Sequence, residues 1–265
     1  MCMTTQSILP PASIANYVSS IAVIEHTDPH GNLMMPLIAN GYPCIAFQVA
    51  GSALTLGDAE KIGNLVLYGQ FVKPEDLHAK GLFTIIAYFL YPPVLKQFFG
   101  YNAREFTNTY IDLSLQQPAR EMNLKEQLLN AASLDKRLQL MNSFIEKLAA
   151  LNYADMNKAI FFATQAIRKS HGLLSLKELQ QELYITERTF QRLFESHVGV
   201  SPKLFSRICQ FHAAFQQLNV SRPGRLIDIA YTTGYADESH FIRSFKEFTN
   251  CSPKEYLKKS AEFIS

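Results

Sequence analysis

Short apolar runs bounded by turn-forming residues dominate the first third of the chain. Runs at 44–49, 64–68 and 82–89 are rich in β-branched and aromatic side chains, a composition that predicts strands. Residues that favour turns separate these runs, at Pro36, Gly41, Gly51, Gly57, Gly63 and Gly81. We therefore expect a small β-sandwich or barrel over about residues 8–92, then a short helix from Pro93 to Phe99 and a polar loop to residue 112.

The apolar pattern changes to helical spacing after Leu113. Apolar residues recur every three or four positions, first at Leu124, Leu128 and Leu129 and then at Leu138, Met141, Ile145, Leu148 and Leu151. This period predicts amphipathic helices at 121–131 and 135–151. The residues Asn-Tyr-Ala-Asp at 152–155 interrupt the period, and Asp155 is a suitable N-cap for a helix running to about Lys169.

The remaining sequence is helical in pattern as far as Ser265. The helix that starts near Asp155 is expected to end at His171-Gly172, and every clear apolar period after it has helical spacing. The pattern therefore divides this α+β chain into three parts: a β-rich domain at 1–115, a helical segment at 116–152 and an all-α domain at 153–265.

Two segments of the all-α domain share a sequence pattern. The string FESHVGVSPKLF closes at Phe205, and FKEFTNCSPKEY closes at Tyr256, 51 positions later. Extended toward the N-terminus without a gap, this alignment pairs eight identical residues and three more that keep apolar or aromatic character. Two copies are too few for a solenoid, which needs about three or more. A small domain used twice is expected instead.

Each copy carries the signals of two short helices joined by a tight turn. In the first copy Ser175 and Thr186 are suitable N-caps, and Glu178 follows Ser175 at the spacing of a capping box. In the second copy Gly234 supplies the turn and Asp237 the N-cap. Two short helices joined in this way form a helix-turn-helix, which places its second helix in the major groove of DNA.

The polar face of each second helix carries side chains that can read base edges. With Phe190, Leu193 and Phe194 facing inward, the outward residues of the first copy are Arg188, Gln191, Arg192 and Glu195, and those of the second are Glu238, Ser239, Ile242, Arg243 and Lys246. Arginine can bind guanine and glutamine can bind adenine, each with about 1–3 kcal/mol of discrimination. Many polar helix faces are merely solvated, but arginine at the same register in two copies favours DNA contact.

The charge is unevenly distributed along the chain. Residues 1–152 hold 10 Lys and Arg against 12 Asp and Glu, whereas residues 153–265 hold 15 against 11. This asymmetry indicates a polyanionic partner for the second half, although the net charge of the chain is only +2. The high apolar content, 48%, predicts packed cores and argues against general disorder.

Cysteine usage and the N-terminal sequence bear on the compartment. Cys2, Cys44, Cys209 and Cys251 form no CxxC pair, so neither a disulfide framework nor a zinc knot is expected, and a reducing compartment is indicated. The first residues lack the basic and apolar regions of a signal peptide. The longest apolar run, 82–90, is too short to cross a bilayer. We expect a cytoplasmic protein without a membrane partner.

A set of residues in and after the second copy carries a resemblance to a known family: Ile229-Ala230, Gly234-Tyr235, Ser239, Phe241, Arg243, Phe245-Lys246 and Ser252-Pro253-Lys254-Glu255-Tyr256. The segment from about 158 to 260 resembles the DNA-binding domain of AraC/XylS-type transcription regulators. The resemblance implies that each second helix enters a major groove and that a long helix, here Ser201 to about Leu218, joins the two units. Such a helix is roughly 26 Å long. This length suits two recognition helices that lie about 34 Å, or one DNA turn, apart.

The resemblance also implies roles for individual residues. The candidate DNA-binding residues are Glu187, Arg188, Gln191, Arg192, Glu238, Ser239, His240, Arg243 and Lys246. The second unit has fewer Arg and Gln side chains, so it is expected to contribute more phosphate contact and the first unit more of the sequence choice. Gln210 departs from the family pattern, because relatives often have arginine near this position. A local salt bridge or phosphate contact is therefore in doubt, whereas the fold is not.

The resemblance implies a sensing domain in the first half, commonly cupin-like, and therefore a one-component regulator controlled by a small-molecule effector. The stretch from Phe83 to Leu113, with the helices after it, is similar to the N-terminal domains of some poorly characterised regulators of this class and implies no particular ligand. In this family, helices such as those at 121–131 and 135–151 often form a homodimer. Packing against their own barrel explains these helices equally well.

The expected partner is double-stranded DNA. Two forms of the function are compatible with it. In the first, an effector on the N-terminal domain controls a regulator, either an activator or a repressor, for which RNA polymerase is a candidate partner. In the second, the chain is a ligand-free DNA-binding regulator whose N-terminal domain serves only oligomerisation or protein–protein contact. An apolar cavity in the N-terminal domain would distinguish the first form from the second.

Candidate chemistry in the first half is sparse. His26 and His30 lie four positions apart with Asp28 between them, but Pro29 and Gly31 favour a polar loop over a metal site. The histidine-rich motif of metal-bearing cupins is absent. No convergent set of His, Cys or carboxylate side chains indicates catalysis, so we expect no enzyme activity, no cofactor and no metal.

Two further features of the first half have alternative explanations. Tyr42-Pro43-Cys44 resembles the reactive Pro-Cys of DNA-alkylation repair regulators, but Ile45-Ala46 follow where His-Arg would activate a thiolate, so a buried strand cysteine is expected. Six aromatic residues either line an apolar pocket or pack in an ordinary core: Phe47, Tyr68, Phe71, Phe83, Tyr88 and Phe89.

Overall fold

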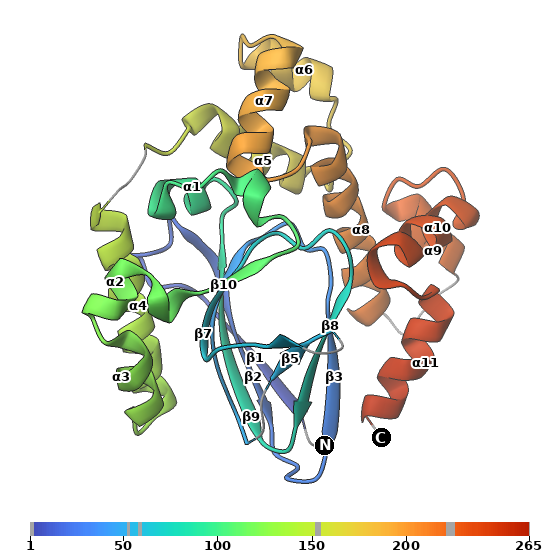
Figure 1. Ribbon diagram of the computed structural model, residues 1–265. Helices are drawn as coiled ribbons and strands as arrows, with labels where there is room; N and C mark the ends of the chain where they lie inside the picture. The colour runs from blue at the N-terminus through green and yellow to red at the C-terminus, as the bar shows by residue number, and fades with distance from the viewer. Residues whose placement is uncertain (1–2, 52–53, 58–59, 152–154, 221–225, 265) are drawn as a thin grey trace.

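The N-terminal half contains two antiparallel sheets that face each other, as Figure 1 shows. The computed structural model describes residues 3–51, 54–57, 60–151, 155–220 and 226–264. The larger sheet has the order β1 (Met3–Ile8), β2 (Val18–His26), β9 (Phe83–Leu90), β4 (Cys44–Ala50), β7 (Leu65–Tyr68), β10 (Tyr110–Asp112). The smaller sheet has the order β3 (Asn32–Leu37), β8 (Glu75–Lys80), β5 (Thr55–Leu56), β6 (Glu60–Lys61). The sandwich-like or barrel-like fold class is confirmed.

Strand β4 shows why these residues form a two-sided sheet. Its side chains alternate between two apolar clusters: Ile45 and Phe47 lie in the cluster beneath the helices, and Cys44 and Ala46 lie in the cluster between the sheets. Successive strand residues point to opposite faces, so a strand covered on both faces must be apolar throughout. The three apolar runs at 44–49, 64–68 and 82–89 agree with β4, β7 and β9 to within one or two residues at each end.

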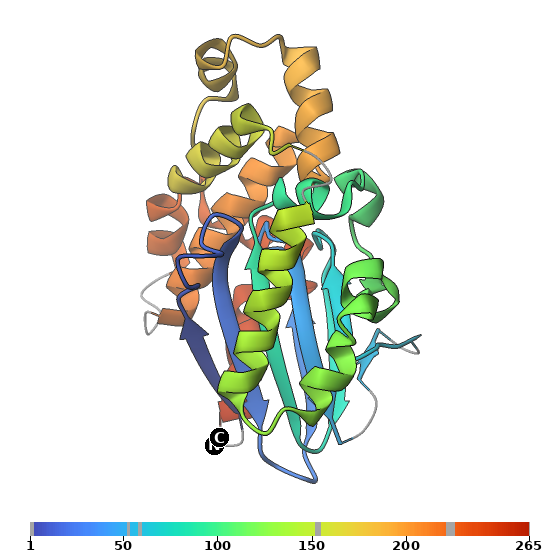
Figure 2. The same cartoon turned by 90° about the vertical axis from the view of Figure 1, so that its left-hand side faces the viewer.

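A set of helices covers the outer face of the larger sheet: α1 (Val94–Phe99), α2 (Gln117–Glu121), α3 (Leu124–Asn130) and α4 (Leu134–Leu151). Figure 2 shows α4 lying over the sheet and running roughly along its strands. Its Met141, Phe144, Ile145 and Leu148 are fully buried in the same cluster as the sheet residues. Of the two explanations for these helices, the structure therefore supports packing against their own sheet.

Three expectations about this region are wrong in detail. Leu129 and Leu151 are 39% and 46% exposed rather than on the packed face. Leu129 follows the buried Leu128 by one residue, which turns it about 100° away on a helix, and Leu151 is the last residue of α4. The expected polar loop before residue 112 instead contains the 3₁₀ helix η1 (Ala103–Phe106) and β10; a second 3₁₀ helix, η2 (Leu113–Leu115), follows directly.

The C-terminal half is helical: α5 (Lys158–Lys169), α6 (Leu176–Glu182), α7 (Glu187–Val198), α8 (Pro202–Val220), α9 (Leu226–Thr232), α10 (Glu238–Thr249) and α11 (Pro253–Ile264). The N-cap expected at Asp155 is wrong. Asn157 caps α5, because its Oδ1 accepts a hydrogen bond from Ile160 N at 3.0 Å. Residues 152–154, where we expected the helical period to break, lie outside the described residues.

Each helix-turn-helix has its own apolar cluster, and α8 contributes to both. Phe205 of α8 belongs to the cluster of α5, α6 and α7, and Phe211 belongs to the cluster of α9 and α10. Figure 1 shows α8 running down between the sheets and the second unit, with α5, α6 and α7 above. The joining helix is therefore in contact with both helix-turn-helix units and with the N-terminal half.

Candidate DNA interface and adjoining cavity

The first unit has the capped geometry that its sequence predicts. Thr186 Oγ1 accepts a hydrogen bond from Thr189 N at 3.3 Å and so begins α7. Gly199, with φ of 93°, ends the helix in the left-handed conformation that favours glycine. Phe194 fixes the inward face, since its ring lies 5.5 Å from those of Phe190 and Phe205. The opposite face of α7 is directed to solvent.

The second unit repeats this arrangement. Asp237 Oδ1 accepts a hydrogen bond from His240 N at 2.7 Å at the start of α10. Asn250, with φ of 59°, ends α10 as Gly199 ends α7. The next helix begins with a reciprocal capping box, in which Ser252 N donates to Glu255 Oε2 at 2.6 Å and Glu255 N donates to Ser252 Oγ at 3.3 Å. The duplicated string is therefore the exit of each unit.

Helix α8 holds the second unit through polar contacts as well. Gln210 Nε2 donates to the carbonyl of Thr233 at 3.0 Å, in the turn between α9 and α10. Arg207 forms an ion pair with Glu247 of α10. The residue that departs from the family pattern thus satisfies a carbonyl of the helix-turn-helix, and the fold is kept without an arginine there.

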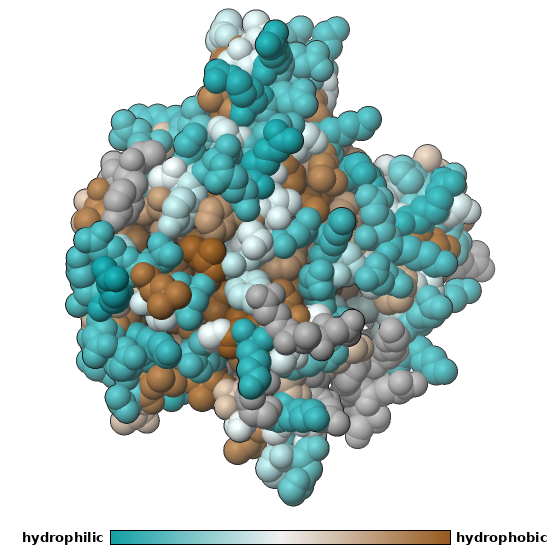
Figure 3. Space-filling view, viewed as in Figure 1, coloured by the Kyte–Doolittle hydropathy of each residue, from teal (hydrophilic) through white to brown (hydrophobic). Residues whose placement is uncertain are grey.

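The outward faces of α7 and α10 present the candidate DNA-binding residues to solvent. Among these nine residues only Glu238 is half-buried; the others are exposed: Glu187, Arg188, Gln191, Arg192, Ser239, His240, Arg243 and Lys246. In the described part of the chain no ion pair forms at any of the four cations Arg188, Arg192, Arg243 and Lys246. Figure 3 shows mostly hydrophilic side chains over α6 and α7. These cations are therefore free to bind phosphates or base edges.

One of these polar side chains is held within its own helix. Gln191 Nε2 donates to Glu195 Oε1 at 3.1 Å, and Glu195 also lies 3.9 Å from Arg104 Nη1 of the N-terminal half. To read an adenine, Gln191 must exchange this hydrogen bond for contacts with the base. Glu195 and Arg104 therefore influence the orientation of a candidate base-reading residue.

The N-terminal half contacts the end of α7 through η1 and Thr107, which the sequence did not predict. Thr107 Oγ1 donates to the carbonyl of Gly199 at 2.8 Å. A Cβ on Gly199 would lie only 2.8 Å from the carbonyl oxygen of Ala103, so the close approach also requires glycine. Asn102 and Arg104 line a surface cleft together with the outward residues of α7. The first recognition helix is thus in direct contact with the N-terminal half.

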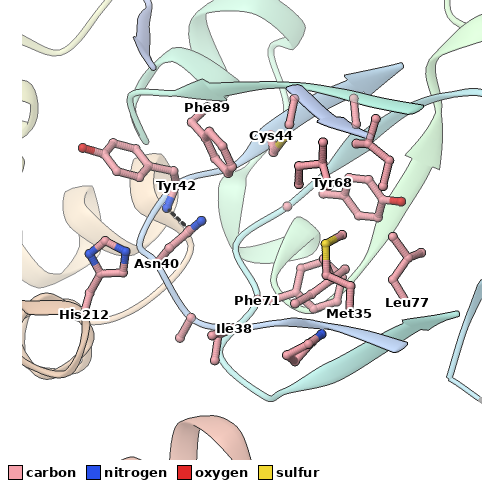
Figure 4. Close-up of a pocket in the computed structure, with 18 of the residues that line it drawn as sticks. Met35, Ile38, Asn40, Tyr42, Cys44, Tyr68, Phe71, Leu77, Phe89 and His212 are labelled. Carbon is pink, nitrogen blue, oxygen red and sulfur yellow. Dashed lines mark hydrogen bonds between the residues drawn. The ribbon is translucent and has the colours of Figure 1, made fainter. Parts of the chain in front are cut away.

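A cavity of about 250 Å³ lies between the two sheets and α8. Figure 4 shows Tyr68 and Leu77 at one end and Asn40, Tyr42 and His212 at the other. Helix α8 contributes Phe211, His212 and Phe215 to the wall. Of the six aromatic residues considered for a pocket, Tyr68, Phe71 and Phe89 line it; the remaining three, Phe47, Phe83 and Tyr88, belong to the packed clusters.

The cysteines of the described residues differ in their surroundings. Cys44 lies on β4 and is buried, as expected, and burial raises the pKa of its thiol to about 12. Burial also raises the pKa of the Cys209 thiol to about 11, with a smaller opposing effect of Arg168. Cys251 is half-buried. The thiolate is the reactive form, so Cys44 and Cys209 are poor nucleophiles at neutral pH.

This difference predicts an order of alkylation. At pH 8 iodoacetamide should label Cys251 at least about tenfold faster than Cys44 or Cys209, because only a buried, protonated thiol is offered at the latter two positions. Mass spectrometry of digested protein after timed labelling measures the three rates. In 8 M urea the three rates should converge. Equal rates in the native protein would contradict the burial of Cys44 and Cys209.

The histidine pair of the first half lies at the end of β2. His26 Nδ1 is 2.9 Å from the carbonyl oxygen of Gly81, and its ring stacks on Phe83. His30 N donates to Asp28 Oδ1 at 2.9 Å, as in a polar turn. Within the described ranges, no group of three or more His, Cys, Asp or Glu side chains is close enough to hold a metal ion. No described helix is both long and apolar enough to cross a membrane.

Two family models match separate parts of the sequence. Residues 179–259 match a helix-turn-helix domain, and residues 6–112 match a domain of unknown function (DUF6597). An uncharacterized HTH-type transcriptional regulator of Haemophilus influenzae is 29% identical over 113 residues. These residues are 39% of this chain and 38% of that protein, so the chain matches less than two fifths of the length of its relative.

Solved structures of ToxT from Vibrio cholerae share the fold over nearly the whole chain. A 1.65 Å structure has a TM-score of 0.52 at 13% identity and covers 97% of this chain and 98% of that one. A structure with (E)-4-(8-methylnaphthalen-1-yl)but-3-enoic acid bound has a TM-score of 0.53, with the same identity and coverage. A structure with an unsaturated fatty acid bound has a TM-score of 0.51 at 13% identity and covers 97% and 95%. The likeness at this identity concerns the fold.

Proposed function

Because its C-terminal half is an AraC-type domain with two helix-turn-helix units, we propose that this chain is a transcription regulator that binds double-stranded DNA through α7 and α10. The observation that carries the proposal is the pair of capped helices with Arg192 and Arg243 at the same register on their outward faces. Neither arginine forms an ion pair with another described residue. Helix α8 has 19 residues. It is roughly 28 Å long, comparable to one DNA turn of about 34 Å.

The two units differ in their proposed contributions. In the first, Arg188, Gln191 and Arg192 contact base edges, with Glu187 at the start of the helix. In the second, Arg243 and Lys246 contribute mainly to phosphate binding, and Glu238, Ser239 and His240 lie at the end of α10 that enters the groove first. Phosphate contacts set register and orientation, whereas base contacts set specificity. The first unit therefore determines more of the sequence choice.

Arg192→Ala should weaken binding to a specific duplex by about 1–3 kcal/mol, or roughly 5-fold to 150-fold. The reason is the loss of a bidentate contact to a guanine, while the exposed position of Arg192 leaves the fold unchanged. Fluorescence anisotropy with a duplex selected by the wild-type chain measures the effect. Arg120→Ala removes an exposed arginine from α2 and serves as the control. Unchanged affinity of Arg192→Ala would count against the assignment.

The cavity supports effector control in preference to a ligand-free N-terminal domain. It is apolar, it lies between the sheets, and its wall includes three residues of the joining helix α8. A molecule in the cavity would contact both the N-terminal half and the element that connects the two DNA-binding units. The ToxT structures with an acid bound have the same fold at low identity. Their ligands therefore support a ligand-binding role without naming the ligand.

A continuous set of contacts links the cavity wall to the first recognition helix. Gly69 lines the cavity, and its N donates to the carbonyl of Thr109 at 3.0 Å. Two residues before Thr109, Thr107 donates to the carbonyl of Gly199 at the end of α7. A ligand that displaces the wall at Gly69 therefore acts on the segment that contacts α7. This is the proposed route of control.

The oligomeric state and the partner proteins follow from the resemblance alone. We propose a homodimer that contacts RNA polymerase as an activator. Much of the apolar surface of α4 is already used against its own sheet. A dimer contact through this region therefore has to use the apolar side chains that remain exposed, which include Leu115, Leu129 and Leu151.

A further inference from the structure

We propose that the effector held in the cavity is a compact, uncharged and largely apolar molecule with a single hydrogen-bonding group directed at His212 and Asn40. This inference rests on the proposed function of the cavity as an effector site. It adds the chemical class of the ligand and the end of the cavity at which the polar group is placed.

The first observation is the absence of charge from the cavity wall. No Asp, Glu, Lys or Arg of the described residues lines the cavity; its wall is formed by aliphatic, aromatic and neutral polar side chains. An ionised carboxylate loses its hydration on entering such a space, and this is costly unless a cation or several donors replace the water. The acid named in the ToxT structure carries such a group, whereas no charged side chain of the described residues lines this cavity.

Arg168 is a cation close to the cavity, because it acts electrostatically on the lining residue His212. It lines a neighbouring cleft that shares Asn40, Tyr42, Phe89 and His212 with the cavity, but it does not line the cavity itself. Its Nη1 donates to the carbonyl of Asn40 at 3.1 Å, and its guanidinium lies 3.5 Å from the centre of the Tyr42 ring. The side chain is therefore engaged in holding the segment at 40–42. It is not a member of the cavity wall.

At the end of the cavity near Tyr68, the side chains of Tyr68 and Gln48 already hydrogen-bond each other and the backbone. Tyr68 OH donates to Gln48 Oε1 at 3.0 Å, and Gln48 Nε2 donates to the carbonyl of Gly63 at 2.8 Å. Burial raises the pKa of Tyr68 well above its ordinary value, which keeps the phenol neutral. With these groups already paired, this end accepts the apolar part of a ligand.

The opposite end, on the side of α8, offers unpaired polar atoms. Asn40 Oδ1 accepts from Tyr42 N at 2.9 Å, and among the described residues its Nδ2 has no hydrogen-bond partner. The His212 ring likewise has none in the described chain. Burial lowers the pKa of His212 to about 4, so the neutral ring presents one donor and one acceptor. Figure 4 shows both side chains at this end.

The cavity volume limits the size of the ligand. Its volume is about 250 Å³. A dry cavity of about 150 Å³ accommodates benzene, so this one suits a molecule of roughly ten to fifteen non-hydrogen atoms. Carbonyl, hydroxyl and primary amide groups satisfy a neutral imidazole and an amide N–H without carrying charge. Small aromatic amides and medium-chain alcohols therefore represent the ligand class.

A matched pair of probes tests the claim about charge. Naphthalene-2-carboxamide and naphthalene-2-carboxylate have nearly the same shape and differ in charge. Isothermal titration of the full chain at pH 7.5 should give a dissociation constant at least about tenfold lower for the amide, because only the carboxylate must be desolvated as an ion. The pair 1-decanol and decanoate should show the same order.

Two variants test the location. Ala46 is 2% exposed on β4 and lines the cavity, so Ala46→Leu should fill it and abolish amide binding. His212→Leu should weaken amide binding about tenfold and leave binding of naphthalene itself unchanged, because it removes only the polar contact. Thermal melting and DNA affinity of each variant report whether the fold is retained.

Three results would overturn this inference. They are carboxylate binding as tight as amide binding, no binding of the amide or 1-decanol at millimolar concentration, and an amide affinity unaffected by both Ala46→Leu and His212→Leu. Binding of the wild-type chain to its selected duplex is measured alongside. A chain that binds DNA but not the amide contradicts the ligand class alone. A chain that binds the amide but prefers no DNA sequence contradicts the proposed regulator and leaves the ligand class standing.

Discussion

The double variant Arg188→Ala/Arg192→Ala should lose specific DNA binding by at least about 30-fold, since each arginine contributes about 1–3 kcal/mol of base discrimination. The two side chains lie four residues apart on the outward face of α7, and both are exposed. Within the described part of the chain neither forms an ion pair, so their removal leaves no partner unpaired. Anisotropy titration of wild type and variant against the selected duplex measures the loss, and circular dichroism verifies the helical content.

A matched variant distinguishes base reading from loss of charge. Arg120→Ala/Lys136→Ala also removes two positive charges, but from exposed positions of the N-terminal half. Its affinity for the selected duplex should stay within about threefold of the wild-type value, because these residues lie outside the proposed interface and long-range effects are screened by salt. An equal loss in both double variants would assign α7 a general electrostatic role and contradict the base contacts.

Gly69→Ala should lower the free energy of unfolding by more than about 4 kcal/mol or prevent folding, which places it among the exceptional substitutions. A Cβ at this position would lie 1.7 Å from the carbonyl oxygen of Phe106 and 2.7 Å from its carbon. Both are backbone atoms of the segment that also contacts α7, so relief of the clash would require η1 to move. Urea unfolding monitored by fluorescence or circular dichroism measures the change in the midpoint.

Gly51→Ala is the control for this substitution. A Cβ on Gly51 has its nearest neighbour, the carbonyl oxygen of Leu82, at 3.7 Å, an ordinary contact. Gly51→Ala should therefore shift stability by less than about 1 kcal/mol. If Gly69→Ala unfolded at the same urea concentration as Gly51→Ala, the close packing of Gly69 on the Phe106 backbone would be wrong, and with it the proposed route from the cavity to α7.

The helical half was largely predictable because its signals are local. Ser175, Thr186 and Asp237 cap the helices that their positions predicted. Gly199 and Asn250 end the recognition helices in the left-handed conformation, which glycine and asparagine favour at this position. Caps, turns and apolar periods depend on residues within a few positions of one another, so a single sequence carries them. Because the helix-turn-helix is repeated, its caps, turns and apolar periods occur twice in the sequence.

The contacts between the halves were not predictable for the converse reason. The hydrogen bond from Thr107 to Gly199 joins residues that are 92 positions apart. The cavity wall combines the sheets with Phe211, His212 and Phe215 of α8. A pattern within α8 alone cannot show which elements its apolar side chains contact. Competing caps were also beyond local reasoning, since Asp155 and Asn157 both suit the start of α5.

Selection of bound duplexes from a random pool by the full wild-type chain tests the central claim most directly. Two recognition helices joined by α8 predict an enriched pattern with two conserved segments whose centres are about 10 base pairs, one DNA turn, apart. The selected duplex should bind at least about 1,000-fold more tightly than a scrambled duplex of the same composition at physiological salt. No enriched pattern, together with equal affinity for selected and scrambled duplexes, would contradict a sequence-specific DNA-binding regulator.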